Sequence, residues 1–152
     1  MGAPDLGQGL TTVAAQVTSE MLGIDYEQIE IKQLDTTTSP NGGPTITSRT
    51  TFLVGNSLID ACNDAIKVLL QFASEVLDIP KEDLSYRNGL VIINQTHKVQ
   101  EIPVKYFVAK ASEDNCHLIG QATSSSPYPE DTPDKYRPGM PHVMFIPTPP
   151  VS

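Results

Sequence analysis

The sequence predicts an α+β fold, a mixed arrangement in which one long helix packs on small sheets. Apolar residues at steps of three and four, from about Thr47 to Asp78, predict a helix that holds most of the core. The turn Arg87-Asn88-Gly89 between short apolar segments predicts a β-hairpin, because Asn-Gly is a strong hairpin signal. Only 6% of the residues are aromatic, so the core is expected to be aliphatic.

Shorter patterns predict the elements that precede and interrupt the long helix. Helical spacing of apolar residues predicts a helix over residues 10–22, with Gly23 as its C-terminal stop. Near-alternation of apolar and polar residues over 28–34 predicts a half-buried strand. Gly55 lies inside the long helix, where glycine costs about 1 kcal/mol. We expect Gly55 to let another backbone pack closely rather than to break the helix.

The elements after the long helix are smaller. The hairpin is expected to pair residues 84–86 with 90–93, and residues 98–102 could add a third strand. Pro103 suits the start of a short helix to about residue 111. Residues 116–122 are expected to form a further strand.

The chain is expected to divide into a folded segment, residues 1–123, and a proline-rich extended tail, residues 124–152. Eight of the 13 prolines lie between Pro127 and Pro150. Such a composition is typical of a linker, a wrapping loop or a region ordered only by a partner.

Composition excludes several classes of function. A net charge of -8 argues against a nucleic-acid surface, which needs a basic footprint. There is no apolar run long enough to span a membrane and no signal-peptide pattern at the start. The cysteines, Cys62 and Cys116, form no CxxC pair, and Cys62 is expected to be a buried thiol. These features predict a cytoplasmic protein.

The first candidate binding segment is the turn Gly7-Gln8-Gly9, immediately before the first predicted helix. Glycines allow a ligand to approach the backbone, and a helix N-terminus presents N–H groups that favour anions. The Gln8 amide offers both donors and an acceptor, which suits the edge of a heterocycle. Taken alone, these residues are explained better by a simple turn that caps the helix.

The second candidate is the start of the long helix, which follows the loop Asn41–Ile46. Clustered hydroxyls, free N–H groups and one arginine resemble a phosphate-binding site. The alternative is an N-cap by Thr47 or Ser48 with a solvated Arg49. The residues expected to bind are Thr47, Ser48, Arg49, Thr50 and Thr51.

Catalytic patterns are otherwise lacking in the sequence. The histidines His97, His117 and His142 have no metal-ligand spacing, and no GxSxG, HExxH or GxGxxG sequence occurs. No pair of carboxylates stands out as an acid and base. We therefore assign no catalytic residue and no metal ligand.

The order of the motifs resembles the molybdenum hydroxylases, the family of xanthine dehydrogenase, aldehyde oxidoreductase (aldehyde oxidase) and carbon monoxide dehydrogenase. The resemblance is strongest over residues 5–65. It is carried by the GQG turn, Met21-Leu22-Gly23-Ile24, Asp35-Thr36-Thr37, Pro44-Thr45, Ser48-Arg49, Thr51 and Gly55-Asn56. Leu6 stands where many members have methionine, a conservative change.

The resemblance implies an oxidoreductase subunit that binds molybdopterin, in bacteria often as the cytosine dinucleotide, and hydroxylates a heterocycle or aldehyde with oxygen from water. By position, Gln8 would hydrogen-bond the pterin, with Gly7 and Gly9 allowing close approach. Residues 47–51, above all Ser48 and Arg49, would hold the pyrophosphate. The implied partners are the remainder of the molybdenum subunit and iron–sulfur and flavin subunits or domains.

Two departures from the family indicate an internal fragment of the large subunit. The glycine- and phenylalanine-rich loop expected upstream and the glutamate segment expected downstream are both lacking, so no residue here is the general base. The chain alone is expected to be inactive, to hold little or no cofactor and to self-associate through uncovered faces. The alternatives are a stand-alone cofactor carrier or interaction domain and a degenerate reading frame.

Overall fold

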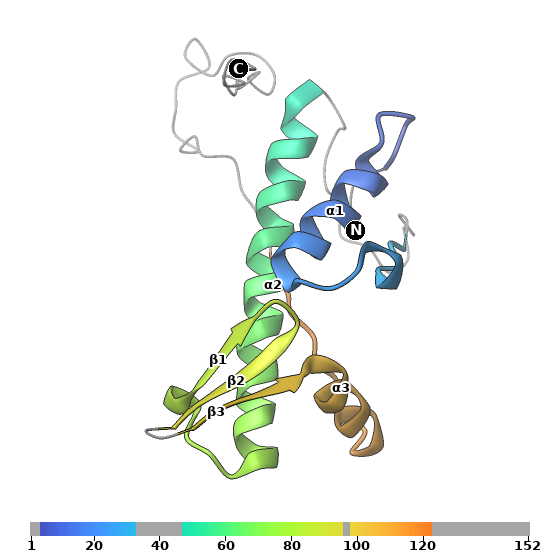
Figure 1. Ribbon diagram of the computed structural model, residues 1–152. Helices are drawn as coiled ribbons and strands as arrows, with labels where there is room; N and C mark the ends of the chain where they lie inside the picture. Colours follow the sequence, from blue (N-terminus) through green and yellow to red (C-terminus); the bar gives the residue numbers. More distant parts are fainter. Residues whose placement is uncertain (1–3, 33–46, 96–97, 123–152) are drawn as a thin grey trace, which may run out of the picture.

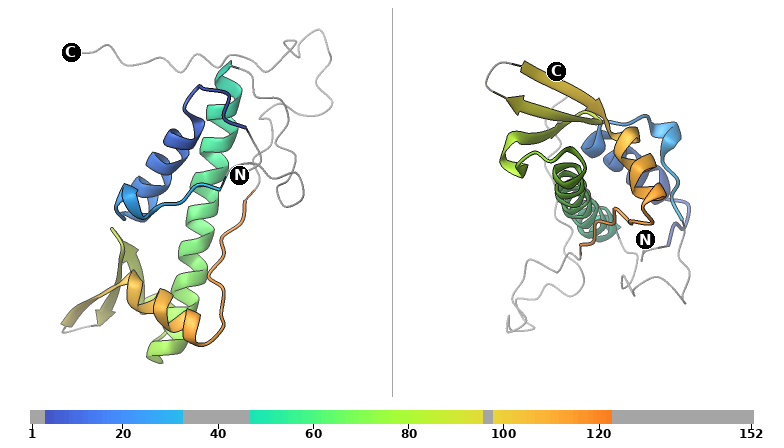
Figure 2. Two further views of the ribbon diagram at one scale, coloured as in Figure 1. Left: turned by 90° about the vertical axis from the view of Figure 1, so that its right-hand side faces the viewer. Right: turned by 90° about the horizontal axis from the view of Figure 1, so that it is seen from below.

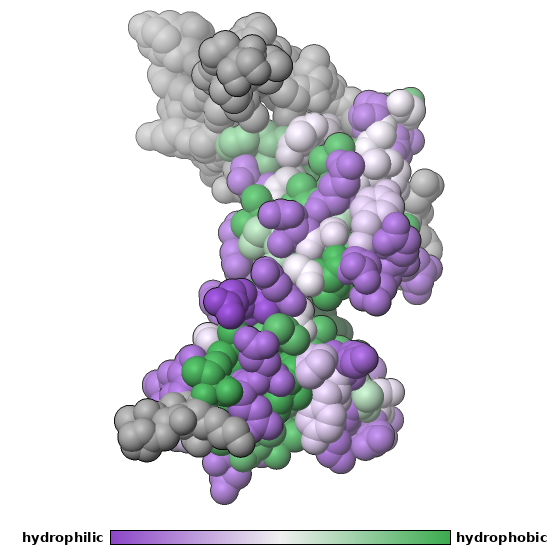
Figure 3. Space-filling view, viewed as in Figure 1, coloured by the Kyte–Doolittle hydropathy of each residue, from purple (hydrophilic) through white to green (hydrophobic). Residues whose placement is uncertain are grey.

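The computed structural model describes residues 4–32, 47–95 and 98–122. Its spine is the helix α2 (Thr47–Leu77). The helix α1 (Leu10–Leu22) lies beside the N-terminal half of α2, and a small sheet and the helix α3 (Val104–Glu113) lie beside its C-terminal half (Figure 1). The surface narrows to a waist between these two regions (Figure 3). The predicted α+β arrangement with one long helix is confirmed. The predicted tail, residues 124–152, lies outside the described residues.

Helix α1 has the predicted bounds and packs on α2 through small side chains. Gly23 ends the helix in the left-handed conformation, with φ of 58°, and its N–H bonds the Ser19 carbonyl. Ala14 and Ala15 of α1 are buried against α2, and Cys62 of α2 is buried as well. Cys62 is 6% exposed, so the predicted buried thiol is confirmed, and this burial raises the pKa of the thiol.

The sheet is a three-stranded antiparallel meander in the order β1-β2-β3. Strands β1 (Leu84–Arg87) and β2 (Leu90–Gln95) form the predicted hairpin, and β3 (Lys98–Pro103) is the predicted third strand. Asn88 and Gly89 make the two-residue turn with φ of 49° and 74°. Positive φ at both positions is what a type I′ turn requires, so Asn-Gly is suited to this hairpin.

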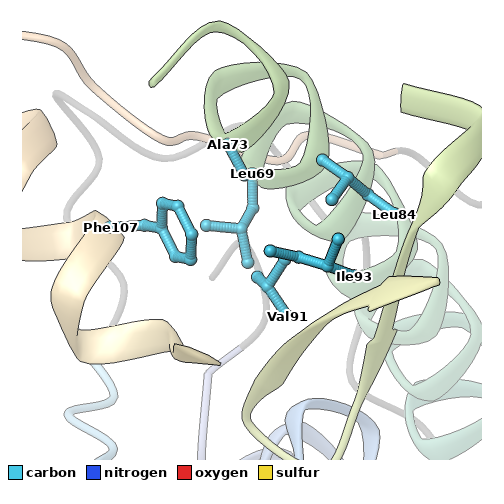
Figure 4. Close-up of a cluster of buried hydrophobic side chains, with 6 residues drawn as sticks. All are labelled: Leu69, Ala73, Leu84, Val91, Ile93 and Phe107. Carbon is cyan, nitrogen blue, oxygen red and sulfur yellow. The ribbon is translucent and has the colours of Figure 1, made fainter. Parts of the chain in front are cut away.

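The main core lies where α2, the sheet and α3 meet. Its side chains are apolar and point toward one another (Figure 4). The buried members are Leu69, Ala73, Leu84, Val91, Ile93 and Phe107. All but one are aliphatic, as the composition predicts, and the exception, Phe107, is fully buried and enters the cluster from α3 (Figure 4).

The hairpin turn joins the two regions by docking on the C-terminal end of α1. The Tyr86 hydroxyl donates to the Leu22 carbonyl over 2.5 Å. A Cβ on Gly23 would lie 2.3 Å from the Cα of Asn88, so only glycine fits this approach. Burial raises the pKa of Tyr86, which keeps the hydroxyl protonated as a donor.

The predicted strand over residues 28–34 is wrong within the described part of the chain. Residues Tyr26–Gln28 form a short 3-10 helix, and residues 29–32 have no strand partner there. Ile29 has an extended backbone, with φ of -101° and ψ of 119°. Alternating side chains favour an extended backbone, but a strand also needs a neighbour to accept its ladder hydrogen bonds. Residues 33 and 34 lie outside the described residues.

The predicted strand over residues 116–122 is also wrong, because this segment lies along α2 instead of along a sheet edge (Figure 2). A Cβ on Gly120 would lie 2.2 Å from the Ala61 carbonyl oxygen. The Gln121 N–H donates to the Asp64 carboxylate over 3.0 Å. The close backbone approach expected at Gly55 is therefore found at Gly120, and no described atom lies within 4 Å of a Cβ built on Gly55.

Candidate functional site

The two predicted binding segments lie at the same end of the molecule. Helices α1 and α2 run side by side in the same direction, so the GQG turn before α1 and the first turn of α2 lie at the same end (Figures 1 and 2). Residues 7–9 and 47–51 are far apart in the sequence, and the packing of α1 on α2 brings them together.

The GQG turn is open to solvent and has a glycine-dependent backbone. Gly7 and Gly9 have φ of 102° and 76°, values that side-chain-bearing residues rarely adopt. No described atom lies within 4 Å of a Cβ built on either residue. These glycines are therefore needed for backbone shape, and they leave space above the turn for a ligand.

Asp5 organises the backbone of this turn. Its Oδ1 accepts hydrogen bonds from the N–H groups of Gly7, at 3.0 Å, and Gly9, at 3.2 Å. Its Oδ2 accepts from the Thr11 N–H at 2.9 Å and from the Thr11 hydroxyl. These bonds, led by that of the Thr11 hydroxyl, hold the pKa of Asp5 down to about 2.

The Gln8 side chain folds over the same loop. Its Oε1 accepts from the Leu6 N–H over 2.6 Å, and its Nε2 donates to the Pro4 carbonyl over 3.2 Å. A primary amide carries two N–H groups and two acceptor sites. Each bond uses one of these, so the exposed Gln8 amide retains one donor and one acceptor.

Sequence reasoning missed Asp5 and misjudged the charge at this end of α1. The expectation was that free N–H groups would favour an anion, but three of them already donate to the Asp5 carboxylate. A carboxylate ahead of a helix is a known capping pattern, so the signal was present in Asp5-Leu6-Gly7.

The second segment is the N-terminal end of α2. Thr47, Ser48 and Arg49 occupy its first turn, their side chains lie outside what the structure describes, and no acidic residue is present there. Thr51 is exposed. Thr50 is buried, with 4% of its surface exposed, and among the described residues its hydroxyl has no hydrogen-bond partner. The loop Asn41–Ile46 lies outside the described residues.

Other polar residues do not gather into a second centre in the described ranges. His117 and Cys116 are both exposed beyond the end of α3, and no group of three or more potential metal ligands occurs in the described part of the chain. His97 and His142 lie outside it. No helix within the described ranges is long and apolar enough to cross a membrane.

Comparison with known proteins identifies the family. Residues 1–146 match the molybdopterin cofactor-binding domain. The chain belongs to this family. The match extends well beyond residues 5–65, where the motifs of the sequence are concentrated.

Similar proteins bear out the resemblance to molybdenum hydroxylases. The chain is 32% identical, over 80% of its length, to the 6-hydroxypseudooxynicotine dehydrogenase complex subunit gamma of Paenarthrobacter nicotinovorans. It is 38% identical, over 47% of its length, to the mouse xanthine dehydrogenase/oxidase. The reconstituted CO dehydrogenase of Oligotropha carboxidovorans superposes with a TM-score of 0.68 at 25% identity, over 84% of this chain and 16% of that one.

The chain corresponds to a small part of these relatives. It spans 16% of the Paenarthrobacter subunit and 5% of mouse xanthine dehydrogenase/oxidase. The family and its fold therefore apply to this segment directly, whereas the activity of a complete enzyme does not.

Proposed function

We propose that this molybdopterin cofactor-binding segment forms one wall of the cofactor site in a xanthine dehydrogenase-type hydroxylase. The observation that carries the proposal is the placement of the GQG turn and the N-terminal end of α2 at the same end of the molecule. In this arrangement one ligand can contact both segments. Gln8, between Gly7 and Gly9, would bond the pterin, and residues 47–51 would hold the pyrophosphate of a dinucleotide form, the cytosine dinucleotide.

The charges of the two helix ends support this assignment of pterin and pyrophosphate. The N-terminal end of α1 already holds the Asp5 carboxylate, so a second anion there would be repelled. The first turn of α2 contains Arg49 and no acidic residue, so it favours an anion. A neutral pterin edge therefore suits the α1 end, and a pyrophosphate suits the α2 end.

Thr50 supplies an independent reason to expect a ligand or partner at the α2 end. A buried hydroxyl without a hydrogen-bond partner costs free energy, and native proteins rarely leave one. The Thr50 hydroxyl, in the first turn of α2, has no partner among the described residues. A phosphate oxygen or a group that binds with the cofactor would satisfy it.

The reaction belongs to the complete enzyme. The bound cofactor supplies the molybdenum centre at which a heterocycle or an aldehyde is hydroxylated. The residues of this chain bind and orient that cofactor, and we assign no base among them. The partners we propose are the rest of the molybdenum subunit and iron–sulfur and flavin subunits or domains, in the cytoplasm, where the free thiols Cys62 and Cys116 would stay reduced.

The proposal is tested by replacing Thr50 with valine, which has the same shape without the hydroxyl. The Thr50→Val chain should be as stable as the original or more stable by about 1 kcal/mol, because an unpaired buried hydroxyl is removed. Its affinity for molybdopterin cytosine dinucleotide, followed by pterin fluorescence, should fall by roughly fivefold to tenfold. Stability is measured by urea unfolding without the cofactor.

The matched control is Thr18→Val on α1, whose hydroxyl is already bonded to the Ala14 carbonyl over 2.8 Å. It should leave cofactor affinity unchanged. Equal affinity of the Thr50→Val and original chains would contradict the role given to Thr50. If the original chain binds no dinucleotide, the stand-alone carrier function is excluded. The wall proposal is then decided by whether Thr50→Val lowers the cofactor content of the complete subunit.

A further inference from the structure

We infer that Asp5 is a positioning residue that holds the GQG turn in the shape in which Gln8 meets the cofactor. The inference rests on the proposed function, since it concerns how the pterin-binding group is held. Asp5 itself has no capacity left for a ligand. A carboxylate has about four acceptor sites, and Gly7, Gly9 and both polar groups of Thr11 occupy Asp5.

The bonds of Asp5 and Gln8 are reciprocal. One oxygen of Asp5 accepts from Gly7 and Gly9, the two neighbours of Gln8 in the chain. The Gln8 amide in turn bonds the carbonyl of Pro4 and the N–H of Leu6, the two neighbours of Asp5. Each of the two side chains therefore fixes the backbone on both sides of the other. The second Asp5 oxygen ties this closed loop to the first turn of α1 through Thr11.

We call these reciprocal bonds of Asp5 and Gln8 the clamp. The clamp matters because the turn would otherwise be mobile. Glycine loses more conformational freedom on ordering than any other residue, and the turn contains two glycines at positive φ. Gly7 and Gln8 are exposed, so packing contributes little to holding the turn in place. A loop that is already ordered binds more tightly than one that must be ordered on binding. Asp5 thus acts on the cofactor through Gln8 and without touching it.

The test is a double-mutant cycle on the 152-residue chain with Asp5→Asn, Gln8→Ala and both together. Asparagine keeps the shape of aspartate but loses the charge and places an amide N–H opposite the Thr11 N–H. Molybdopterin cytosine dinucleotide is the probe, followed by pterin fluorescence. We expect Asp5→Asn to lower affinity roughly tenfold. If Asp5 acts through Gln8, the double variant should bind no more weakly than Gln8→Ala alone.

The control is Glu20→Gln, which removes the same charge from an exposed position on α1. It should change affinity less than twofold, roughly the effect of one remote surface charge. If the losses of the two single variants multiply in the double variant, Asp5 does not act through Gln8 and the inference is overturned. Unchanged affinity of Asp5→Asn also overturns it.

A second measurement separates failure of this inference from failure of the proposed function. The NMR signals of the Gly7 and Gly9 N–H groups and of the Gln8 side-chain amide should all move in Asp5→Asn. If they do not, the clamp does not exist, whether or not cofactor binds. If they move but the original chain binds no dinucleotide, cofactor binding by the chain alone fails, and the inference is then decided by the cofactor content of the complete subunit. Asp5→Asn should lower that content, and unchanged content overturns the inference.

Discussion

The two regions of this molecule on either side of its waist differ in what holds them together. Around the C-terminal half of α2, large apolar side chains from α2, the sheet and α3 form one core (Figure 4). Around the N-terminal half, the buried residues are mostly small or polar, such as Ala14, Ala15, Cys62 and Thr50. The first region is stabilised by its own packing. The second carries the candidate cofactor contacts, and its buried Thr50 hydroxyl has no hydrogen-bond partner among the described residues.

This difference indicates that the C-terminal region maintains the fold, and under our proposal the N-terminal region would serve the ligand. Burial of large apolar side chains is the main favourable term in folding. A site that must accept a ligand needs polar groups and open space, so it buries fewer large apolar side chains. The hydrogen bond from Tyr86 to the Leu22 carbonyl ties the C-terminal region to the far end of α1, the helix that begins at the GQG turn.

The largest expected effect is that of Phe107→Ala, which removes a large side chain from the C-terminal core. Phe107 is fully buried. Removing a buried phenylalanine ring costs about 3–5 kcal/mol, a large share of the stability of a small domain. Urea unfolding measures this change. Val108→Ala, at a neighbouring position that is 53% exposed, is the control and should cost far less. Similar costs for the two variants would show that this core does not dominate.

A smaller and more local effect is expected on acidification, confined to the N-terminal region. The pKa of Asp5 is lowered from 3.8 to about 2 by its hydrogen bonds. A lowered pKa in the folded state means that the carboxylate stabilises the loop above about pH 4. This contribution is lost as the pH falls through about 2. The Gly7 and Gly9 N–H signals should titrate in this window while those of β2 do not.

In Asp5→Asn the titration of these two glycine signals should be lost. If the Gly7 and Gly9 N–H signals titrated near pH 4 in the original chain, Asp5 would not hold the loop. A simultaneous change in β2 would mean that the two regions unfold together, and the comparison between them would fail.

The smallest effect is expected for Gly55→Ala in the part of α2 that belongs to the N-terminal region. Gly55 is helical, and no described atom lies within 4 Å of the added Cβ. Alanine should stabilise the chain by about 0.5–1 kcal/mol, because it reduces the freedom of the unfolded state. Gly120→Ala is the matched control and should destabilise, since its Cβ would lie 2.2 Å from the Ala61 carbonyl oxygen. Destabilisation by Gly55→Ala would reveal a neighbour that covers this face of α2.

The sequence alone determined the elements that depend on local signals. The long helix, the helix before Gly23, the Asn-Gly hairpin and the third strand all follow from apolar spacing and turn residues, whose effect is confined to a few neighbouring positions. The order of the motifs likewise led to the family. The two failed strands, residues 28–34 and 116–122, show the limit of this reasoning. Their backbones are extended in part, but whether a sheet neighbour exists is decided far away in the chain.

Only the tertiary structure decided how the candidate site is built. It placed the GQG turn beside the N-terminal end of α2, because α1 and α2 pack in the same direction through small side chains. The structure also shows that the close backbone contact expected at Gly55 occurs at Gly120. The N–H groups of Gly7 and Gly9, which were expected to be free, donate to Asp5. Distance and hydrogen-bond pairing depend on three-dimensional packing, and for that reason no pattern of neighbouring residues determined them.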